Sequence, residues 1–387
     1  MQNESSTSST PSFVPGLELS RRFYEELVQP IMREAFPNLP YAAALIGQGS
    51  EVLGFDTPQS RDHDWGARLF IFLREADAQH GDEISNLLSH LLPPRYLDAP
   101  VHFDQIPSEP RTRIMLRPVT GPVRHRVIPI TLRNFTRIQA GCDLTQPLSV
   151  ADWLTIPSSV LGGLIAGAVY HDSVGEVTAL RHQFAWYPHD IWLYLLASGW
   201  QRIGEEEHLM PRAGDTGDEL GSAIIGSRLI RDVIRQCFLL ERQYAPYAKW
   251  LGTAFMRLRS APEMAPLLQQ AQQATTWRER EAALARAYEL LAHLQNALGV
   301  ANPVLPETVS HFYDRPYLVI HGARFAEALR QQIRDPEVQR LASRHLIGNI
   351  DQWNDNVGLL GLEHAQLRRV YEDEQDGEAD KASETKG

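Results

Sequence analysis

The chain has 387 residues, of which 43% are hydrophobic and 22% are charged, as expected for a globular protein of two or three domains. Its net charge of −11 argues against a protein body that holds nucleic acid by bulk electrostatics, although a local basic groove is compatible with it. The two cysteines, Cys142 and Cys237, lie far apart and outside any CxxC pattern. Zinc ribbons and disulfide scaffolds are therefore disfavoured, and a reducing, cytoplasmic location fits the sequence.

Both ends of the chain predict disorder. Residues 1–16 begin with MQNESSTSSTPS, which has neither the basic segment nor the apolar core of a secretion signal and is predicted to be a disordered leader. Residues 371–387 are predicted to be an acidic, disordered tail. No uninterrupted apolar run reaches the roughly 18 residues of a membrane span, so no membrane partner is expected.

The first part of the chain, residues 17–146, predicts a domain that mixes helices and strands. A helix is expected over residues 17–36, kinked or ended by Pro30, because apolar residues recur there at helical spacing: Phe23, Leu27, Ile31 and Ala35. Short apolar runs predict strands at residues 41–47 and 68–73, and a helix is expected at 84–92. A third strand is expected at 126–132, where Pro129 limits it to a sheet edge or a bulge.

After residue 147 the pattern becomes helical. Two apolar stripes at helical spacing indicate helices that pack together: Leu229, Val233, Ile234, Cys237, Phe238 and Leu240 in one, and Leu284, Tyr288, Leu291 and Leu298 in the other. We therefore expect an all-α bundle over residues 147–370, with one or two further helices from 334 on. The fold class predicted for the whole chain is α+β.

The residues that point to chemistry lie between the first two predicted strands. The first strand ends in Gly47-Gln48-Gly49-Ser50, and Asp62-His63-Asp64 follows twelve residues after Ser50, just before the second strand. Carboxylates two residues apart on a strand point to the same face and make a hard-oxygen site that suits Mg²⁺ or Mn²⁺. Such a metal would bridge triphosphate oxygens.

The glycines add a second reason to expect phosphate binding. Gly47 and Gly49 let backbone N–H groups approach a phosphate, Ser50 adds a hydroxyl donor, and a helix starting near Glu51 would add a partly positive end. Each motif has a plain structural alternative, because Asp-x-Asp pairs are common in turns and Gly-x-Gly alone is weak. The dinucleotide fingerprint is also absent, since Val52 stands where its last glycine is needed. The order of the two motifs before a strand is more specific than either motif alone.

Together these residues resemble the signature of the polymerase-β-like nucleotidyltransferase superfamily. More closely, four segments resemble a bacterial family with the DUF4037 domain: GQGSEVLGFDTPQSRDHDWGARL, WYPHDIWLYLL, LLERQYAPYAKWLGTAF and FYDRPYLV. The resemblance implies an N-terminal nucleotidyltransferase-like mixed sheet followed by a helix bundle, the layout of kanamycin nucleotidyltransferase. It also implies that Gly49 and Ser50 contact the triphosphate and that Asp62 and Asp64 hold the metal.

The superfamily normally adds a third carboxylate on a later strand. The expected strand, residues 126–132, reads Arg-Val-Ile-Pro-Ile-Thr-Leu and contains no acid. Asp104 is the candidate substitute, in a less natural position. This departure puts catalysis in doubt more than nucleotide binding.

The second half of the chain adds weaker candidates. Lys249 is predicted to contact phosphate and Tyr247 to stack on a base or acceptor; the alternative is packing, with the lysine reaching to water. On the acceptor side, one of three residues in a glycine-flanked loop could deprotonate a hydroxyl, the alternative being a capped, solvated loop: His171, Asp172 and Glu176. His63 is interpreted as structural, and the pair Gly163 and Gly167 as close helix packing.

The leading hypothesis is a metal-dependent nucleotidyltransferase that moves AMP from ATP to a hydroxyl or phosphate of a small molecule or protein. The alternatives are a non-catalytic nucleotide-binding module on the same fold, and a helical interaction protein whose first domain is only a scaffold. The acidic net charge makes a nucleic-acid acceptor the less favoured one. The sequence leaves the oligomeric state open, a homodimer included.

Overall fold

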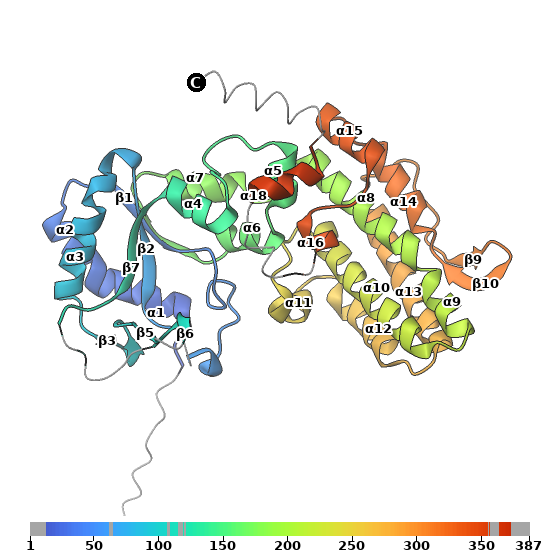
Figure 1. Cartoon of the computed structure of the whole chain (residues 1–387), viewed down its shortest axis with the longest axis horizontal. Helices are drawn as coiled ribbons and strands as arrows, with labels where there is room; N and C mark the ends of the chain where they lie inside the picture. The colour runs from blue at the N-terminus through green and yellow to red at the C-terminus, as the bar shows by residue number, and fades with distance from the viewer. Residues whose placement is uncertain are drawn as a thin grey trace, which may run out of the picture. The chain divides into compact units, whose positions relative to one another are not determined.

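The computed structural model describes residues 13–61, 65–106, 109–114, 119, 121–354, 356 and 364–372. The chain forms two compact units, Met1–Gln139 with Gly163–Gln183 and Ala140–Gly162 with Phe184–Gly387. The first contains a mixed sheet with helices and the second is mainly helical, so the fold class is α+β, as predicted (Figure 1). In the part of the chain that the structure describes, no helix is both long and apolar enough to cross a membrane.

The N-terminal helix is continuous but changes its winding before Pro30. It consists of α1 (Gly16–Phe23), a π-helical turn η1 (Tyr24–Val28) and α2 (Gln29–Ala35). Pro30 has no N–H and its ring would crowd the carbonyl four residues earlier, so the wider turn relieves that conflict. The extra residue shifts the buried stripe by one position from the predicted one, to Leu19, Phe23, Tyr24, Val28 and Met32. Ala35, predicted to face the core, is exposed.

The sheet of the first unit has four strands in the order β7-β2-β1-β8. These are β1 (Tyr41–Leu45), β2 (Arg68–Leu73), β7 (Arg126–Thr131) and β8 (Ala168–Asp172). β1 pairs antiparallel with both β2 and β8, and β2 pairs parallel with β7. β7 lies at the edge, as Pro129 predicted, because proline cannot donate to a neighbouring strand.

The strand β8 was not expected from the sequence, which places residues 147–370 in the helical domain. Its residues AVYHD are all half-buried and show no alternation of apolar and polar side chains, and Gly167 and Gly175 flank the segment like a loop. With the following helix α7 (Glu176–Gln183), β8 returns to the first unit and completes its sheet. The predicted domain boundary after residue 146 is therefore wrong for residues 163–183.

Smaller elements complete the first unit. They are η2 (Pro58–Arg61), η3 (Glu75–His80), α3 (Gly81–Leu91), β3 (Arg95–Tyr96), β4 (Ala99–Pro100), β5 (Asp104–Ile106), β6 (Glu109–Ile114) and α4 (Leu132–Ala140). β3 with β4 and β5 with β6 form separate two-stranded sheets. The core lies between the N-terminal helices, α3 and the sheet, and its largest buried side chains include Phe23, Tyr24 and Trp65.

The second unit is a helix bundle with one β-hairpin. Its main helices are α5 (Val150–Thr155), α8 (His189–Glu206), α9 (Leu209–Asp215), α10 (Glu219–Leu240), α11 (Ala248–Phe255), α12 (Ala261–Gln273), α13 (Trp277–Ala297), α14 (Gly322–Arg330) and α15 (Pro336–Arg344). The helix α6 (Ser158–Ile165) spans the division between the units. The strands β9 (Ser310–Phe312) and β10 (Arg315–Val319) form the hairpin, which the predicted all-α bundle did not include.

The two predicted apolar stripes are largely buried in α10 and α13, although Leu298 is exposed. Beyond α15 the predicted helices are only short pieces: α16 (Ile350–Trp353), α18 (His364–Leu367) and η4 (Arg368–Val370).

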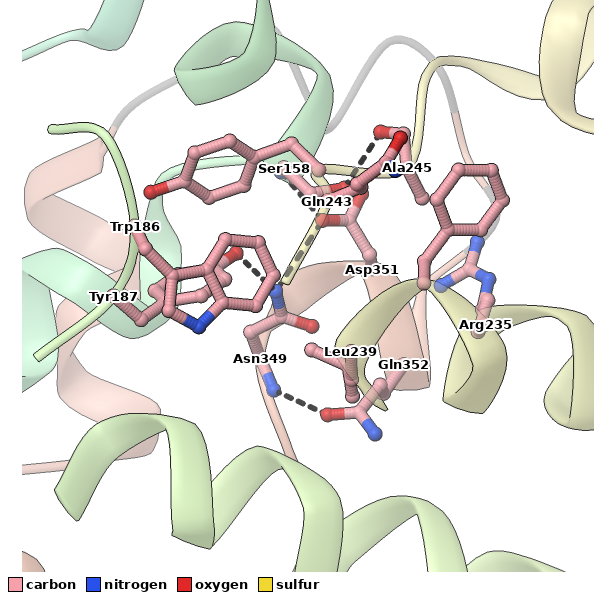
Figure 2. Close-up of a pocket in the computed structure, with 12 residues that line it drawn as sticks. Ser158, Trp186, Tyr187, Arg235, Leu239, Gln243, Ala245, Asn349, Asp351 and Gln352 are labelled. Atoms are coloured by element: carbon pink, nitrogen blue, oxygen red, sulfur yellow. Dashed lines mark hydrogen bonds between the residues drawn. The ribbon is translucent and has the colours of Figure 1, made fainter. Parts of the chain in front are cut away.

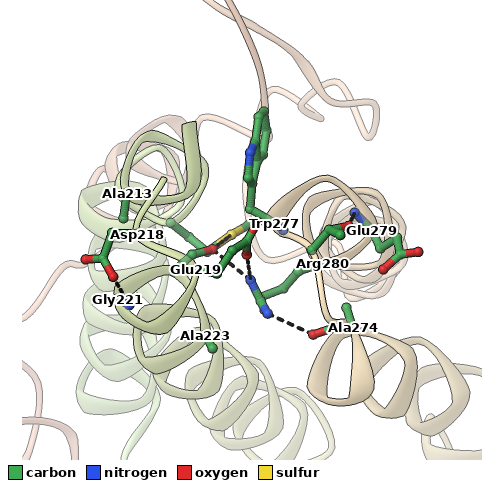
Figure 3. A network of polar contacts seen from close by, with 12 residues as sticks. Ala213, Asp218, Glu219, Gly221, Ala223, Ala274, Trp277, Glu279 and Arg280 are labelled. Atoms are coloured by element: carbon green, nitrogen blue, oxygen red, sulfur yellow. Dashed lines mark hydrogen bonds and ion pairs between the residues drawn. The ribbon is translucent and has the colours of Figure 1, made fainter. Parts of the chain in front are cut away.

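A buried arginine ties three helices of this bundle together. The guanidinium of Arg280 donates to the Ser222 hydroxyl at 2.8 Å and to the Ala274 carbonyl at 2.8 Å, and it faces Glu219 at 3.5 Å (Figure 3). Glu219 also accepts the N–H of Trp277, the first residue of α13. Because every buried donor here has an acceptor, the charge is a structural brace and not a free binding group.

A second polar contact attaches α18 to α5. The buried carboxylate of Asp152 accepts hydrogen bonds from the Ser149 backbone and hydroxyl and lies 2.9 Å from His364 Nε2. Burial raises the pKa of Asp152, but hydrogen bonds from His364 and Ser149 and the nearby Arg368 outweigh it and lower the pKa to about 2.

This contact predicts a pH-dependent stability. Because the folded pKa lies below the ordinary value of 3.8, Asp152 stabilises the fold above pH 3.8, and this contribution is lost as the pH falls towards 2. We expect Asp152→Asn to lower the free energy of unfolding by about 2 kcal/mol at pH 6, with a smaller difference from the wild type near pH 3. Urea denaturation at both pH values checks this. An equal difference at the two values would contradict the assignment.

Candidate functional site

The glycine loop follows β1 directly, as the sequence predicts. Gly47 and Gly49 both adopt positive φ values, +95° and +144°, which favour glycine. The N–H of Gly47 donates to the carbonyl of Gly163 at 2.8 Å, so this amide holds the loop in place and is not free for a phosphate. Among the described residues, the N–H groups of Gly49 and Ser50 make no hydrogen bond. These two amides are therefore candidates to bind an anion.

Two further glycines fix the end of β1. A Cβ on Gly163 would lie 2.5 Å from the Gly47 carbonyl oxygen, and one on Gly167 would lie 2.0 Å from that of Leu45. Gly167 has φ +73° and donates its N–H to Val52 at 3.0 Å. These glycines allow close packing, as predicted, but their partners are the β1 strand and the loop and not a second helix.

The predicted helix near Glu51 is instead a compact turn. Leu53 N–H donates to the Gly49 carbonyl, and Phe55 N–H donates to the Ser50 carbonyl. The chain leaves this turn at Phe55 without continuing a helical ladder, so no helix N-terminus faces the loop. The prediction that a helix dipole helps to bind the phosphate is therefore wrong. Anion binding by the loop depends on its own amides and on nearby cations.

An ion pair that the sequence analysis missed closes this loop. Arg68, the first residue of β2, donates from Nε to Glu51 Oε1 at 2.7 Å and from Nη2 to the Gln48 carbonyl at 2.8 Å. The side chains of Arg68 and Glu51 are 13% and 9% exposed. The sequence shows a charged residue, Arg68, at the start of an apolar strand and a glutamate, Glu51, after Gly-Ser. Neither residue type indicates that the two form an ion pair.

The predicted metal ligands Asp62 and Asp64, with His63 between them, lie outside the described residues. The chain on either side is described: Trp65, bonded directly to Asp64, is buried, and its indole N–H donates to Asp56 at 3.3 Å. Asp56 also accepts the N–H of Gly16 at 2.7 Å. Asp56 therefore attaches the segment just before β2 to the start of α1.

Asp104, the candidate third carboxylate, lies on β5 and not in the four-stranded sheet. It is buried, 3.1 Å from His102 Nε2 and 3.3 Å from Arg124. His102 Nδ1 accepts the N–H of Arg124, so its Nε2 carries the proton that bonds to Asp104. Phe103, next to it, lies against Gly66, two residues before β2. Asp104 thus belongs to a segment that packs near the start of β2, but its carboxylate already has cationic and hydrogen-bonding partners.

The strand expected to carry the third acid has a guanidinium at the matching position. In the parallel pairing of β2 and β7, Arg126 is the register partner of Arg68, and Arg126 lies 5.4 Å from the centre of the Phe103 ring. Over the described part of the chain, no group of three or more His, Cys, Asp or Glu side chains could hold a metal ion. The predicted metal site beside the glycine loop therefore depends on Asp62 and Asp64 as its ligands.

The predicted acceptor-side residues lie at the other end of β1. In the pairing of β8 with β1, His171 lies beside Ala43 and Asp172 beside Ala42, about 17 Å of strand before Gly47. Asp172 accepts hydrogen bonds from the N–H groups of Gly175 and Thr178, so it caps α7. The alternative of a capped segment is the one this geometry supports.

His171 packs against Tyr41 with the rings tilted and their centres 4.7 Å apart, and Glu176 is exposed in the first turn of α7. These positions, and the capping role of Asp172, do not support the prediction that His171, Asp172 or Glu176 deprotonates an acceptor hydroxyl.

Tyr247 and Lys249 belong to the second unit. Tyr247 is 42% exposed and accepts the indole N–H of Trp250 at 2.8 Å. The Lys249 ammonium lies 4.8 Å from the centre of the Trp250 ring. Both contacts are local to the start of α11, and the predicted roles in nucleotide binding stay predictions.

A small cavity in the second unit is walled by aromatic side chains. Trp186, Tyr187 and Tyr244 pack around it with ring centres 4.9–5.1 Å apart (Figure 2). Its volume is about 30 Å³, room for a water molecule or two. Asp351 and Asn349 supply polar groups to the wall, and Asp351 accepts the N–H of Ser158 at 2.6 Å and the Asn349 amide at 3.4 Å. The buried indole N–H of Trp186 has no partner in the described structure, so an ordered water would satisfy it.

The comparisons with known proteins agree with the predicted family over part of the chain. Residues 153–251 match the family model described as "Domain of unknown function (DUF4037)". Nine of the twelve residues that line the aromatic cavity come from this segment, so the matched sequence builds most of its wall. No curated protein matches the chain.

A solved structure of a nucleotidyltransferase-like protein from Exiguobacterium sibiricum 255-15 is similar to this chain at 13% identity. The similarity covers 73% of this chain and 77% of that one, with a TM-score of 0.30. At this level the likeness carries no conclusion about function. The predicted resemblance is confirmed over residues 153–251, which match the DUF4037 family model.

Proposed function

We propose that the first unit binds a nucleoside triphosphate with a divalent metal and transfers a nucleotidyl group, AMP from ATP, to an acceptor. The acceptor would offer a hydroxyl or a phosphate and would be a small molecule or a protein. One observation supports this proposal most: Arg68, four residues after Asp64, hydrogen-bonds to Gln48 in the glycine loop. This contact attaches the start of β2, the strand that follows the Asp-x-Asp motif in sequence, to the glycine loop.

Each part of the site would have one task. The N–H groups of Gly49 and Ser50, which make no hydrogen bond among the described residues, would bind phosphate oxygens, and Asp62 and Asp64 would hold Mg²⁺ or Mn²⁺. The metal, when bound, supplies positive charge that stabilises the negative charge on the triphosphate. The protein would contribute positioning and fixed dipoles, without a covalent intermediate. Transfer forms the bond from the acceptor oxygen to the α-phosphorus and releases pyrophosphate.

The alternative function is nucleotide binding without transfer. It is favoured by β7, which has no acidic residue, and by Asp104, whose carboxylate is already engaged with His102 and Arg124. A general base for the acceptor hydroxyl would then be missing.

Incubation of the full chain with ATP labelled at the α-phosphate separates the two functions. With Mg²⁺ or Mn²⁺ and pooled small-molecule and protein acceptors, the proposal predicts labelled product and an equal amount of pyrophosphate. Measurable ATP binding with neither product would support the non-catalytic alternative. Absence of ATP binding would overturn both and leave a scaffold function.

A further inference from the structure

Arg68 is placed where a phosphate-binding cation is needed, yet it is held by the protein itself. Its guanidinium lies directly under the glycine loop, since a Cβ on Gly49 would be 2.4 Å from Nη2. Two of its three nitrogens are engaged, Nε with Glu51 and Nη2 with Glu51 and the Gln48 carbonyl. Within the described structure, Nη1 makes no hydrogen bond. The guanidinium therefore has one further donor, Nη1, beside the two nitrogens that the protein holds.

The polar contacts of the Glu51 side chain within the described structure are those with Arg68. Its Oε1 accepts from Arg68, and Oε2 lies near the position where Gly49 would carry a Cβ, 2.7 Å away. The carboxylate is almost buried and faces the loop in which, among the described residues, the amides of Gly49 and Ser50 make no hydrogen bond. A negative charge at this point repels phosphate, so a triphosphate can approach the loop only if the Arg68–Glu51 pair loosens or turns.

We propose that Arg68 is the polyphosphate-binding cation of this site and that Glu51 holds it in place until the ligand arrives. This inference rests on the proposed function. On binding, the planar guanidinium exchanges its Glu51 and Gln48 oxygens for oxygens of the β- or γ-phosphate, which it matches with two parallel N–H groups. Glu51 thereby lowers the affinity for single phosphates and other small anions, which cannot compensate for the lost ion pair.

The exchange makes a prediction that a purely structural ion pair does not. Arg68→Gln is expected to weaken binding of inorganic tripolyphosphate about tenfold or more, because a charge-assisted hydrogen bond is lost. Glu51→Gln is expected to tighten it severalfold, because Arg68 is released. In the double variant the gain from Glu51→Gln should vanish, since it acts through Arg68. If the pair were only a brace for the loop, both single changes would weaken binding.

Calorimetric titration of the full chain with tripolyphosphate measures these affinities. Arg74→Gln and Asp77→Asn are matched controls, because this ion pair lies beyond the far end of β2 and the variants change the net charge equally. Arg68→Lys keeps the charge but loses the two parallel N–H donors of the guanidinium. Its affinity for tripolyphosphate should therefore lie between those of the wild type and Arg68→Gln. Circular dichroism and thermal melting of each variant identify a loss of fold.

Three outcomes overturn the inference: wild-type chain that does not bind tripolyphosphate, a folded Arg68→Gln variant that binds like the wild type, or a gain from Glu51→Gln that persists without Arg68. The last would indicate simple charge repulsion. Metal-dependent ATP binding that is unchanged in Arg68→Gln would leave the proposed function intact. Conversely, Arg68-dependent tripolyphosphate binding without metal-dependent ATP binding would contradict the function alone.

Discussion

Replacement of Asp62 or Asp64 by asparagine is expected to abolish metal-dependent binding of ATP, with a loss of affinity of at least about 100-fold. The reason is that changes beside a metal ligand already cost about 10- to 100-fold, and removal of a charged oxygen ligand costs more. The side-chain volume is almost unchanged, so the fold should survive. Calorimetric titration with ATP and Mg²⁺, beside circular dichroism of each variant, measures both effects.

Asp82→Asn is the matched control for these variants. Asp82 is exposed in the first turn of α3, in the same unit, and its loss should cost only a few tenths of a kcal/mol of stability. ATP affinity that is equal in Asp62→Asn, Asp64→Asn and Asp82→Asn would mean that the two carboxylates hold no metal for the nucleotide.

The largest effect on stability is expected from Gly167→Ala. Gly167 has φ +73°, and an added Cβ would lie 2.0 Å from the Leu45 carbonyl oxygen, a backbone atom that a side-chain rotation cannot move away. The left-handed conformation costs alanine about 1–2 kcal/mol, and displacement of β1 adds to it, so we expect a total of about 4 kcal/mol. Because Leu45 leads into the glycine loop, ATP affinity should fall as well.

Gly175→Ala separates the two parts of this cost. Gly175 has a similar φ of +81°, but a Cβ there would meet nothing within 4 Å. Its substitution should cost only the conformational part, about 1 kcal/mol, and should leave ATP affinity unchanged. Urea denaturation of the two variants gives the comparison, and equal losses of stability would show that the contact with Leu45 has no effect.

The elements that the sequence predicted well are those with a strong local signal. The run RLFIFL gave β2 with its bounds at Arg68 and Leu73, and Pro129 placed its strand at the sheet edge. These signals are local. The preference of β-branched and aromatic residues for strands, and the missing N–H of proline, are properties of the residues themselves and do not depend on distant partners.

The elements that were missed depend on distant contacts. β8 has no alternating pattern of its own and becomes a strand by pairing with β1, more than 120 residues earlier in the chain. The π-helical turn before Pro30 shifted the buried stripe, which no helical periodicity at 3.6 residues can anticipate.

The candidate site was predictable in its residue types and not in its pairings. The sequence identified the glycine loop, and its two glycines do adopt positive φ values. It could not show that Gly47 donates to Gly163 or that Arg68 closes the loop, because both contacts join separate segments of the chain.

The most direct test of the central claim is a calorimetric titration of the wild-type full chain with ATP in three buffers, containing Mg²⁺, Mn²⁺ or EDTA. Metal-assisted triphosphate binding predicts a saturable heat with either metal and its loss in EDTA. Equal binding in EDTA, or no binding in any buffer, would contradict the account.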